Sequence, residues 1–161
     1  MRMAGVFLIG FLAGAAVVPG LAQGDRPNGV NYLNHVAIAV DNYDEAFAFY
    51  TQKMGFREAF TVRDDKGQPT LSYVQASRNT FIELQRANAT RPAGLNHFGL
   101  HVENLKATVS ALRERGVKVD DIRVRPDDAS VANATDPNGI RIEMFEFGPG
   151  SPQGKAIASW K

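Results

Sequence analysis

The sequence predicts an α+β fold built from two tandem β-α-β-β-β modules. The first observation behind this prediction is a duplicated stretch: residues 33–40 and 95–102 share Leu-Asn-His and then the same alternation of side chains. The second is that each copy precedes a helical pattern, a glycine and three strand-like runs. A repeat of this length indicates a duplicated module rather than a solenoid unit.

The chain begins with the pattern of a secretory signal peptide over residues 1–22. A short basic start precedes an apolar run, and small residues allow cleavage after Ala22. The apolar run is short for a membrane span of roughly 20 residues, so we expect cleavage rather than the alternative, a retained anchor. The predicted mature protein is exported, to the periplasm or the medium, and residues 23–31 form a flexible leader.

The amino-acid composition limits the kinds of molecule that we expect this protein to bind. A content of 44% hydrophobic and 22% charged residues is typical of a globular domain, not of a disordered chain. The absence of cysteine excludes disulfides and thiolate metal sites. Because 18 basic residues face 17 acidic ones, nothing favours nucleic acid or, after signal cleavage, a membrane surface. A small molecule remains as the expected partner.

The first module is predicted over residues 32–86. Its first strand, residues 33–40, leads to Asn42, which can cap a helix together with Glu45 in a capping-box arrangement. The helix is expected over residues 46–54, and Gly55 suits its C-terminal position. Hairpin turns then connect three expected strands, residues 56–63, 70–75 and 80–85.

The second module is predicted over residues 95–147, after a linker at residues 87–94. Asn104 precedes an expected helix over residues 105–115, and Gly116 ends it. Three expected strands follow at residues 117–124, 130–134 and 140–147, the last two joined by a tight Asp-Pro-Asn-Gly turn.

The domain, residues 32–150, is followed by a C-terminal tail over residues 151–161. Ser151 as a cap and Pro152 at the first position predict a short helix there. Its expected packing face carries Ala156, Ile157 and Trp160.

Alternation along the strands gathers polar side chains on one face. The face that carries the histidines has Leu33, His35, Ala37 and Ala39 in the first copy and Leu95, His97, Gly99 and His101 in the second. Small residues line it, so we expect it to border open space. The opposite face, with Asn34, Val36, Ile38 and Val40, is expected to pack on a helix.

The last strand of each module adds a carboxylate at an equivalent place, Glu83 and Glu143. If the two sheets curl towards each other, the four side chains of His35, Glu83, His97 and Glu143 converge. Two neutral imidazoles and two carboxylates suit one divalent ion such as Zn, Ni, Co, Mn or Fe. Taken singly, a strand His is more often a hydrogen-bonded structural residue and a strand Glu a solvated one.

Four more side chains are candidates for contact with a substrate. His101 lies too far along its strand from His97 to bind the same ion, but it suits a cavity wall. Arg141 could bind a substrate carboxylate or lie at the rim. The remaining two, Phe81 and Phe145, are expected to pack in the cavity wall.

The sequence resembles the vicinal-oxygen-chelate superfamily, the glyoxalase I / bleomycin-resistance / extradiol-dioxygenase group. The matching segments are residues 34–40, 49–50, 54–56, 81–84, 96–102 and 136–143. The resemblance implies a half-open mixed β-barrel around a metal ion, with His35, Glu83, His97 and Glu143 at the four ligand positions. It also implies that the chain forms a homodimer, with a metal site within one subunit or shared by two.

Carboxylates at both 83 and 143 resemble the glyoxalase I type. In that type the ion polarises a substrate carbonyl and a Glu moves a proton between neighbouring carbons. We expect Glu143 to be the moving base, with Glu83 second. The alternatives are an epimerase, which commonly has Gln at the Glu83 position, a dioxygenase with two His and one Glu, and a non-catalytic binding protein of the resistance type.

Two departures from the glyoxalase I pattern concern the substrate. Ala39 stands where those enzymes carry an Arg for the glutathione carboxylate, and Ala87 where they carry Asn, with Asn88 adjacent. An anionic tripeptide would lose a charge-assisted contact. We therefore expect an exported, metal-dependent lyase or isomerase acting on a small α-oxygenated carbonyl compound.

Overall fold

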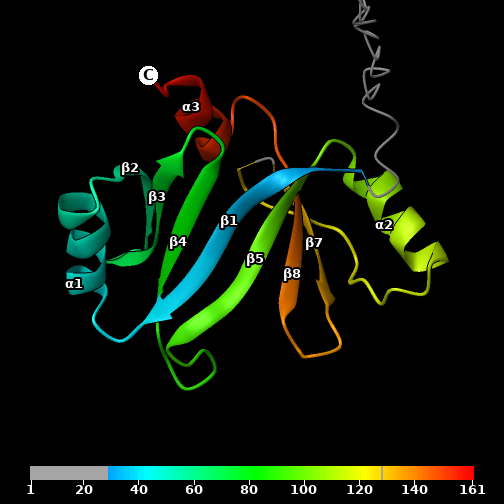
Figure 1. Cartoon of the computed structure of the whole chain (residues 1–161), viewed down its shortest axis with the longest axis horizontal. Helices are drawn as coiled ribbons and strands as arrows, with labels where there is room; N and C mark the ends of the chain where they lie inside the picture. The colour runs from blue at the N-terminus through cyan, green and yellow to red at the C-terminus, as the bar shows by residue number, and fades with distance from the viewer. Residues whose placement is uncertain (1–28, 128) are drawn as a thin grey trace, which may run out of the picture.

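The computed structural model describes residues 29–127 and 129–161, which form one eight-stranded mixed sheet and three α-helices (Figure 1). The predicted signal peptide and residues 23–28 of the predicted leader lie outside this part of the chain. Among the described helices, none combines the length and the apolar character that a membrane crossing requires.

Both modules have the predicted order of elements. The first consists of β1 (Val30–Val40), α1 (Tyr43–Ala48), the π-helical turn η1 (Phe49–Lys53), β2 (Arg57–Arg63), β3 (Pro69–Ser77) and β4 (Thr80–Arg86). The second consists of β5 (Gly94–Val102), α2 (Leu105–Glu114), β6 (Arg123–Val124), β7 (Ser130–Thr135) and β8 (Arg141–Glu146). The helix α3 (Pro152–Ala158) follows. The predicted α+β fold with two β-α-β-β-β modules is confirmed.

The sheet is arranged symmetrically about its two central strands, in the order β2-β3-β4-β1-β5-β8-β7-β6. β1 and β5 pair antiparallel and thereby join the modules. Within each module the first strand pairs parallel with the last, which places Phe81 beside His35 and Arg141 beside His97. The four strands that carry the predicted ligands are therefore the four central strands.

A side-chain oxygen caps the N-terminus of each of the three described α-helices. Asn42 Oδ1 accepts from the Glu45 amide at 3.3 Å, and Asn104 Oδ1 accepts from the Ala107 amide at 2.9 Å. Ser151 Oγ accepts from the Gly154 amide at 3.0 Å, with Pro152 in the first turn. Each bond satisfies a backbone N–H that has no partner inside the helix. The helix expected over residues 46–54 begins earlier, at Tyr43, and widens into the π-helical turn η1.

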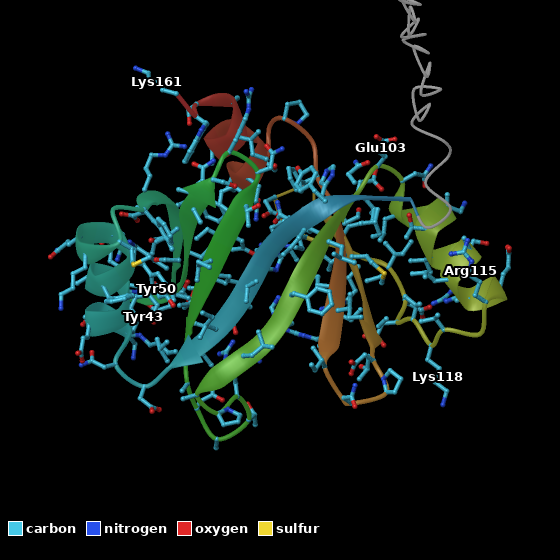
Figure 2. The ribbon with its side chains drawn as sticks, in the orientation of Figure 1. Tyr43, Tyr50, Glu103, Arg115, Lys118 and Lys161 are labelled. Atoms are coloured by element: carbon cyan, nitrogen blue, oxygen red, sulfur yellow. The ribbon has the colours of Figure 1, made fainter. Side chains whose placement is uncertain are left out.

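The packing partners of the helices divide them between the two faces of the sheet. In Figure 1, α1 and α2 lie at opposite sides of the sheet and α3 lies above β3 and β4. Leu105 and Val109 of α2 pack with Met144, which alternates with Glu143 and so faces away from it. On the same outer face, Tyr43 of α1 donates a hydrogen bond to Ser72 Oγ at 2.5 Å (Figure 2). α3 instead covers the face that carries His35, which we call the site face, through Ala156 packed with Tyr73 and Phe81.

The strand expected over residues 117–124 is mostly a loop. Only Arg123–Val124 pairs with β7, and an isolated bridge joins Val119 to Ala134. The Arg113 guanidinium donates to the carbonyls of Val119 and Asp120, and the backbone there turns towards α2. Because this segment lies at the edge of the sheet, it has no strand on its other side to hold it extended.

The strict alternation expected along β1 and β5 is wrong at two asparagines. Asn34 lies opposite no residue, because Leu33 pairs with Leu100 and His35 with Gly99. Asn96 is likewise extra, since Ala37 pairs with His97 and Ile38 with Leu95. Each asparagine is thus the additional residue of a β-bulge, which changes the direction of neighbouring side chains. Asn34 is fully buried, and its Oδ1 lies 2.9 Å from Nδ1 of His35, whose side chain is on the site face.

The site face does not border open space along β1, contrary to expectation. Ala37 and Ala39 are 0% and 1% exposed. The absence of a side chain at Gly99 makes room for the His35 imidazole, which a Cβ at that position would overlap. Small residues therefore allow close packing around the histidine.

We expect Gly99→Ala to destabilise the protein by about 1–3 kcal/mol, because the added methyl displaces a buried ring. Urea unfolding measures the change. Gly148→Ala is the matched control, since a methyl there would meet open space. Equal free energies of unfolding for Gly99→Ala and the unsubstituted protein would contradict the packing described.

Candidate metal centre

Four side chains from the central strands meet at one point of the site face. His35 Nε2 lies 3.1 Å from His97 Nε2 and 3.4 Å from Oε2 of both Glu83 and Glu143. His97 Nε2 lies 3.6 Å from Glu83 Oε2 and 3.9 Å from Glu143 Oε2. All four residues are buried, and a single chain supplies them all.

The two bulges orient the two imidazoles. His35 Nδ1 lies 2.9 Å from Oδ1 of Asn34, and His97 Nδ1 lies 2.7 Å from Oδ1 of Asn96. An amide oxygen can only accept, so the contact at His35 favours a proton on Nδ1 and leaves the Nε2 lone pair of that ring free. Fixing the tautomer in this way prepares an imidazole to bind a metal through Nε2.

The second imidazole has an additional neighbour. Arg141 donates to Asn96 Oδ1 at 2.7 Å and also approaches His97 Nδ1. In the first module the corresponding place beside His35 holds Phe81. The two histidines therefore occupy equivalent positions in the sheet but differ in the charge beside them.

Hydrogen bonds hold the Glu83 carboxylate at both oxygens. The Tyr73 hydroxyl donates to Oε2 at 2.8 Å, and Gln85 Nε2 donates to Oε1 at 2.5 Å. Gln85 in turn accepts from Arg91 at 2.8 Å. These contacts fix the direction in which Glu83 presents its charge.

Glu143 has freer surroundings. Its side chain is 11% exposed against 5% for Glu83, and among the described residues its carboxylate forms ion pairs with the imidazoles of His35 and His97. Glu83 and Glu143 therefore occupy equivalent positions in the two modules, but the side chain of Glu143 is less constrained.

The protonation states suit a metal ion. Burial lowers the pKa of His97 to about 4; Glu83 and Glu143 oppose this shift, and the positive charge of Arg141 adds to it. Burial by itself would raise the pKa of Glu143, but the contact with the His35 imidazole and the positive charge of Arg125 outweigh burial and lower it. At neutral pH the centre thus contains a neutral imidazole and an ionised carboxylate, the forms that bind metals.

The donor set fits a divalent first-row ion. Donor atoms of His35, Glu83 and His97 all lie within 4.8 Å of one another, and Glu143 Oε2 adds a fourth donor next to both imidazoles. Nitrogen and carboxylate oxygen donors in this number suit such an ion. An ion there would also offset the cost of burying two carboxylates.

The other predicted substrate residues surround the centre unequally. His101 stacks on Tyr32 at 4.8 Å and meets Phe147 edge-on at 4.5 Å, in an aromatic group further along β5. Phe81 and Phe145 are fully buried. Phe145 lies edge-on to His35 with ring centres 6.3 Å apart. For the two phenylalanines, a place in a cavity wall and contact with a substrate stay predictions.

Several residues of the centre had not been singled out from the sequence. The two asparagines could have been found, because Asn-His occurs in both copies of the repeat. Tyr73 is harder to find, since its role depends on the pairing of β3 with β4. The positive charge of Arg125 lowers the pKa of Glu143, and its guanidinium lies over the Phe145 ring at 5.6 Å, yet it comes from an irregular segment with no pattern.

Comparisons with known proteins agree with this architecture. A family model described as the glyoxalase/bleomycin resistance protein/dioxygenase superfamily matches residues 32–144. The uncharacterized protein YaeR of Escherichia coli is 30% identical over 73% of this chain and 98% of its own length. A "probable lactoylglutathione lyase" of Synechocystis is 27% identical over 71% of this chain and 95% of its own. The crystal structure of methylmalonyl-CoA epimerase from Mycobacterium tuberculosis has the same fold, with a TM-score of 0.62, 22% identity and coverage of 75% and 91%.

We expect the His97 imidazole to titrate near pH 4 in protein stripped of metal, well below the usual 6.5, because burial disfavours its charged form. Protons should therefore compete with a metal at His97 only below about pH 5, at which one tenth of the ring is charged. Heteronuclear NMR of the ring nitrogens measures the titration. A midpoint above pH 6 would contradict the buried, neutral imidazole.

Proposed function

Because the chain belongs to the glyoxalase/bleomycin resistance protein/dioxygenase superfamily, we propose that it is a metal-dependent lyase or isomerase of the glyoxalase I type. The observation that carries the proposal is the meeting of two imidazoles and two carboxylates at one buried point. A binding protein that only sequesters a ligand has no need of this donor set.

In this proposal His35, Glu83, His97 and Glu143 hold one divalent ion: Zn, Ni, Co, Mn or Fe. When bound, such an ion polarises a substrate carbonyl and stabilises the negative charge that forms on its oxygen. Asn34 and Asn96 keep the imidazoles directed at the ion. The carboxylates of Glu83 and Glu143 have different roles in the proposed reaction.

Glu83 is the fixed ligand and Glu143 the base. Tyr73 and Gln85 occupy both oxygens of Glu83, so proton transfer there would first have to break these bonds. In the described part of the chain no Tyr or Gln side chain donates to Glu143, so in this proposal it can turn towards a substrate carbon. It takes the proton from one carbon and returns it to the neighbouring carbon, while its lowered pKa keeps it ionised between turnovers.

The proposed substrate is a small α-oxygenated carbonyl compound, such as the adduct of a 2-oxoaldehyde with a compact thiol. The Synechocystis relative named for lactoylglutathione directs attention to thiol adducts. However, Ala39 is buried on the site face at the place where the glyoxalase I type has its arginine for glutathione. Export, which we propose from the signal-peptide pattern of residues 1–22, would also favour a different thiol.

An epimerase is the second candidate, supported by the shared fold with methylmalonyl-CoA epimerase. The same carboxylate would then remove and return a proton at a single carbon. A glutamate at position 83, instead of the Gln common in such enzymes, favours the first candidate.

The metal ligands can be tested by elemental analysis of the purified protein. We expect His35→Ala to lower metal affinity by about 100-fold, since it removes a donor atom, and Glu83→Gln to lower it less, since the amide keeps one oxygen donor but loses the negative charge. His101→Ala is the matched control, because the third histidine lies in the separate aromatic group beside Tyr32. Full metal occupancy in His35→Ala would exclude His35 as a ligand.

The division between the carboxylates can be tested by kinetics. We expect Glu143→Gln to keep the metal but to lose about 10²- to 10⁴-fold in kcat, because an amide cannot take up the proton. The assay follows conversion of the methylglyoxal–2-mercaptoethanol hemithioacetal to its lactoyl thioester by NMR in D₂O. If metal-loaded Glu143→Gln turned over normally, Glu143 would not be the base; if the unsubstituted metal-loaded enzyme exchanged the α-proton of a methylmalonyl thioester but did not convert the hemithioacetal, the epimerase would be favoured.

A further inference from the structure

Arg141 touches the metal centre but has no carboxylate partner. Its guanidinium donates to Asn96 Oδ1 at 2.7 Å and approaches Nδ1 of His97, one of the four candidate ligands. Among the described residues no carboxylate lies within ion-pair distance of it, in contrast to arginines elsewhere in the chain. Asp136, in the turn before β8, accepts instead from backbone amides of that turn. The Arg141 side chain is only half-buried, so a ligand can reach it.

The contact between Arg141 and His97 is incompatible with a metal ion on the ring. A neutral imidazole that binds a metal through Nε2 carries its proton on Nδ1, and an N–H group cannot accept from a guanidinium. In the metal-binding form of His97, Arg141 therefore keeps Asn96 as its acceptor but loses the ring nitrogen. Because a guanidinium has five N–H groups and a fixed charge, this form favours an additional, anionic acceptor.

Arg91 has a similar place beside the other module's carboxylate. It lies in the connection between β4 and β5 and donates to Gln85 Oε1 at 2.8 Å, while Gln85 donates in turn to Glu83 Oε1 at 2.5 Å. Its Nε is buried and has no acceptor within the described part of the chain, although the residue as a whole is half-buried. Buried N–H groups in folded proteins are nearly always paired. An acceptor is thus missing at Arg91 as well.

The two arginines lie at the same end of the four central strands. Ala39, near the end of β1, pairs with Gln85 of β4 on one side and with Gly94 of β5 on the other. Arg91 precedes Gly94 by three residues, and Arg141 is the first residue of β8, which runs parallel to β5. In Figure 1 these strand ends lie together at the lower side of the sheet. Both modules therefore contribute a guanidinium to one end of the centre.

We propose that Arg91 and Arg141 bind a carboxylate of the substrate and so act as specificity-determining residues. Guanidinium and carboxylate groups form strong, charge-assisted hydrogen bonds, often in pairs. Only the His97 ring separates Arg141 from the donor atoms of the centre, so the acid group lies a few bonds from the reacting carbonyl. This inference rests on the proposed function for the position of that carbonyl. The substrate class is thereby narrowed to compact α-oxygenated carbonyl compounds that carry a carboxylate, such as the adduct of a 2-oxoaldehyde with mercaptoacetate.

Recognition of the carboxylate is tested with two hydroxamates. Succinic monohydroxamate and butyrohydroxamate bind metal ions through the same group and differ by a carboxylate in place of a methyl group. Calorimetry of the zinc-loaded protein should show about tenfold tighter binding of the first, because a carboxylate gains charge-assisted bonds to the arginines. Arg141→Gln and Arg91→Gln should each lower this preference to about twofold, and Arg141→Lys should restore part of it.

Arg63→Gln is the matched control, since it removes the same charge from an exposed arginine of β2 that donates to a turn carbonyl. It should keep the full preference for succinic monohydroxamate. Equal affinities of the two hydroxamates in the unsubstituted protein would overturn the proposal. An intact preference in either Arg141→Gln or Arg91→Gln would overturn it too.

A second measurement does not depend on the metal. In metal-free protein, NMR of the arginine Nε–H groups should show saturable shifts of the Arg91 and Arg141 signals with succinate but not with uncharged succinamide. Arg91→Gln and Arg141→Gln identify the two signals. If succinate shifted both signals while neither hydroxamate bound the zinc-loaded protein, the proposed metal chemistry would fail and the anion site would stand. Identical responses to succinate and succinamide would overturn the anion site itself.

Discussion

The antiparallel pairing of β1 with β5 is the contact on which the rest of the structure depends. It joins two modules that are each incomplete, because each supplies one imidazole and one carboxylate. A shift of one residue in this pairing would turn the histidine side chains to the other face of the sheet. The bulges at Asn34 and Asn96 fix the register and place an acceptor beside each ring. The pairing of β1 with β5 thus determines both how the two modules join and how the four side chains of the centre are arranged.

Because the module is duplicated, the two glutamates and the two histidines occupy equivalent positions. Their different neighbours nevertheless give them different chemical surroundings. Glu83 and Glu143 stand at equivalent points of equivalent strands, yet Tyr73 and Gln85 bind only the first. His35 and His97 differ in the same way, since Phe81 lies beside one and Arg141 beside the other. A structural and a reactive member of each pair can therefore arise without any change in the backbone plan.

Much of the fold could be predicted because each strand and helix of the module occurs twice in the sequence, so that the pattern of one copy supports the prediction for the other. Caps at Asn42, Asn104 and Ser151, and the faces of Glu83 and Glu143, follow from spacing alone. The segment over residues 117–124 could not be predicted, because its composition suits a strand while its edge position and the Arg113 bonds do not. The direction of Asn34 depends on a bulge, which only the pairing of two distant strands reveals. The donors Tyr73 and Gln85 were missed for the same reason.

The third helix gives the molecule an uneven architecture. α1 and α2 belong to the repeated modules and cover the outer face, whereas α3 occurs once and closes over the inner one. A terminal appendage of this kind can lengthen, shorten or change its sequence during evolution without altering how the eight strands are connected. Related chains that share the same framework of strands can in this way differ in what covers their inner face.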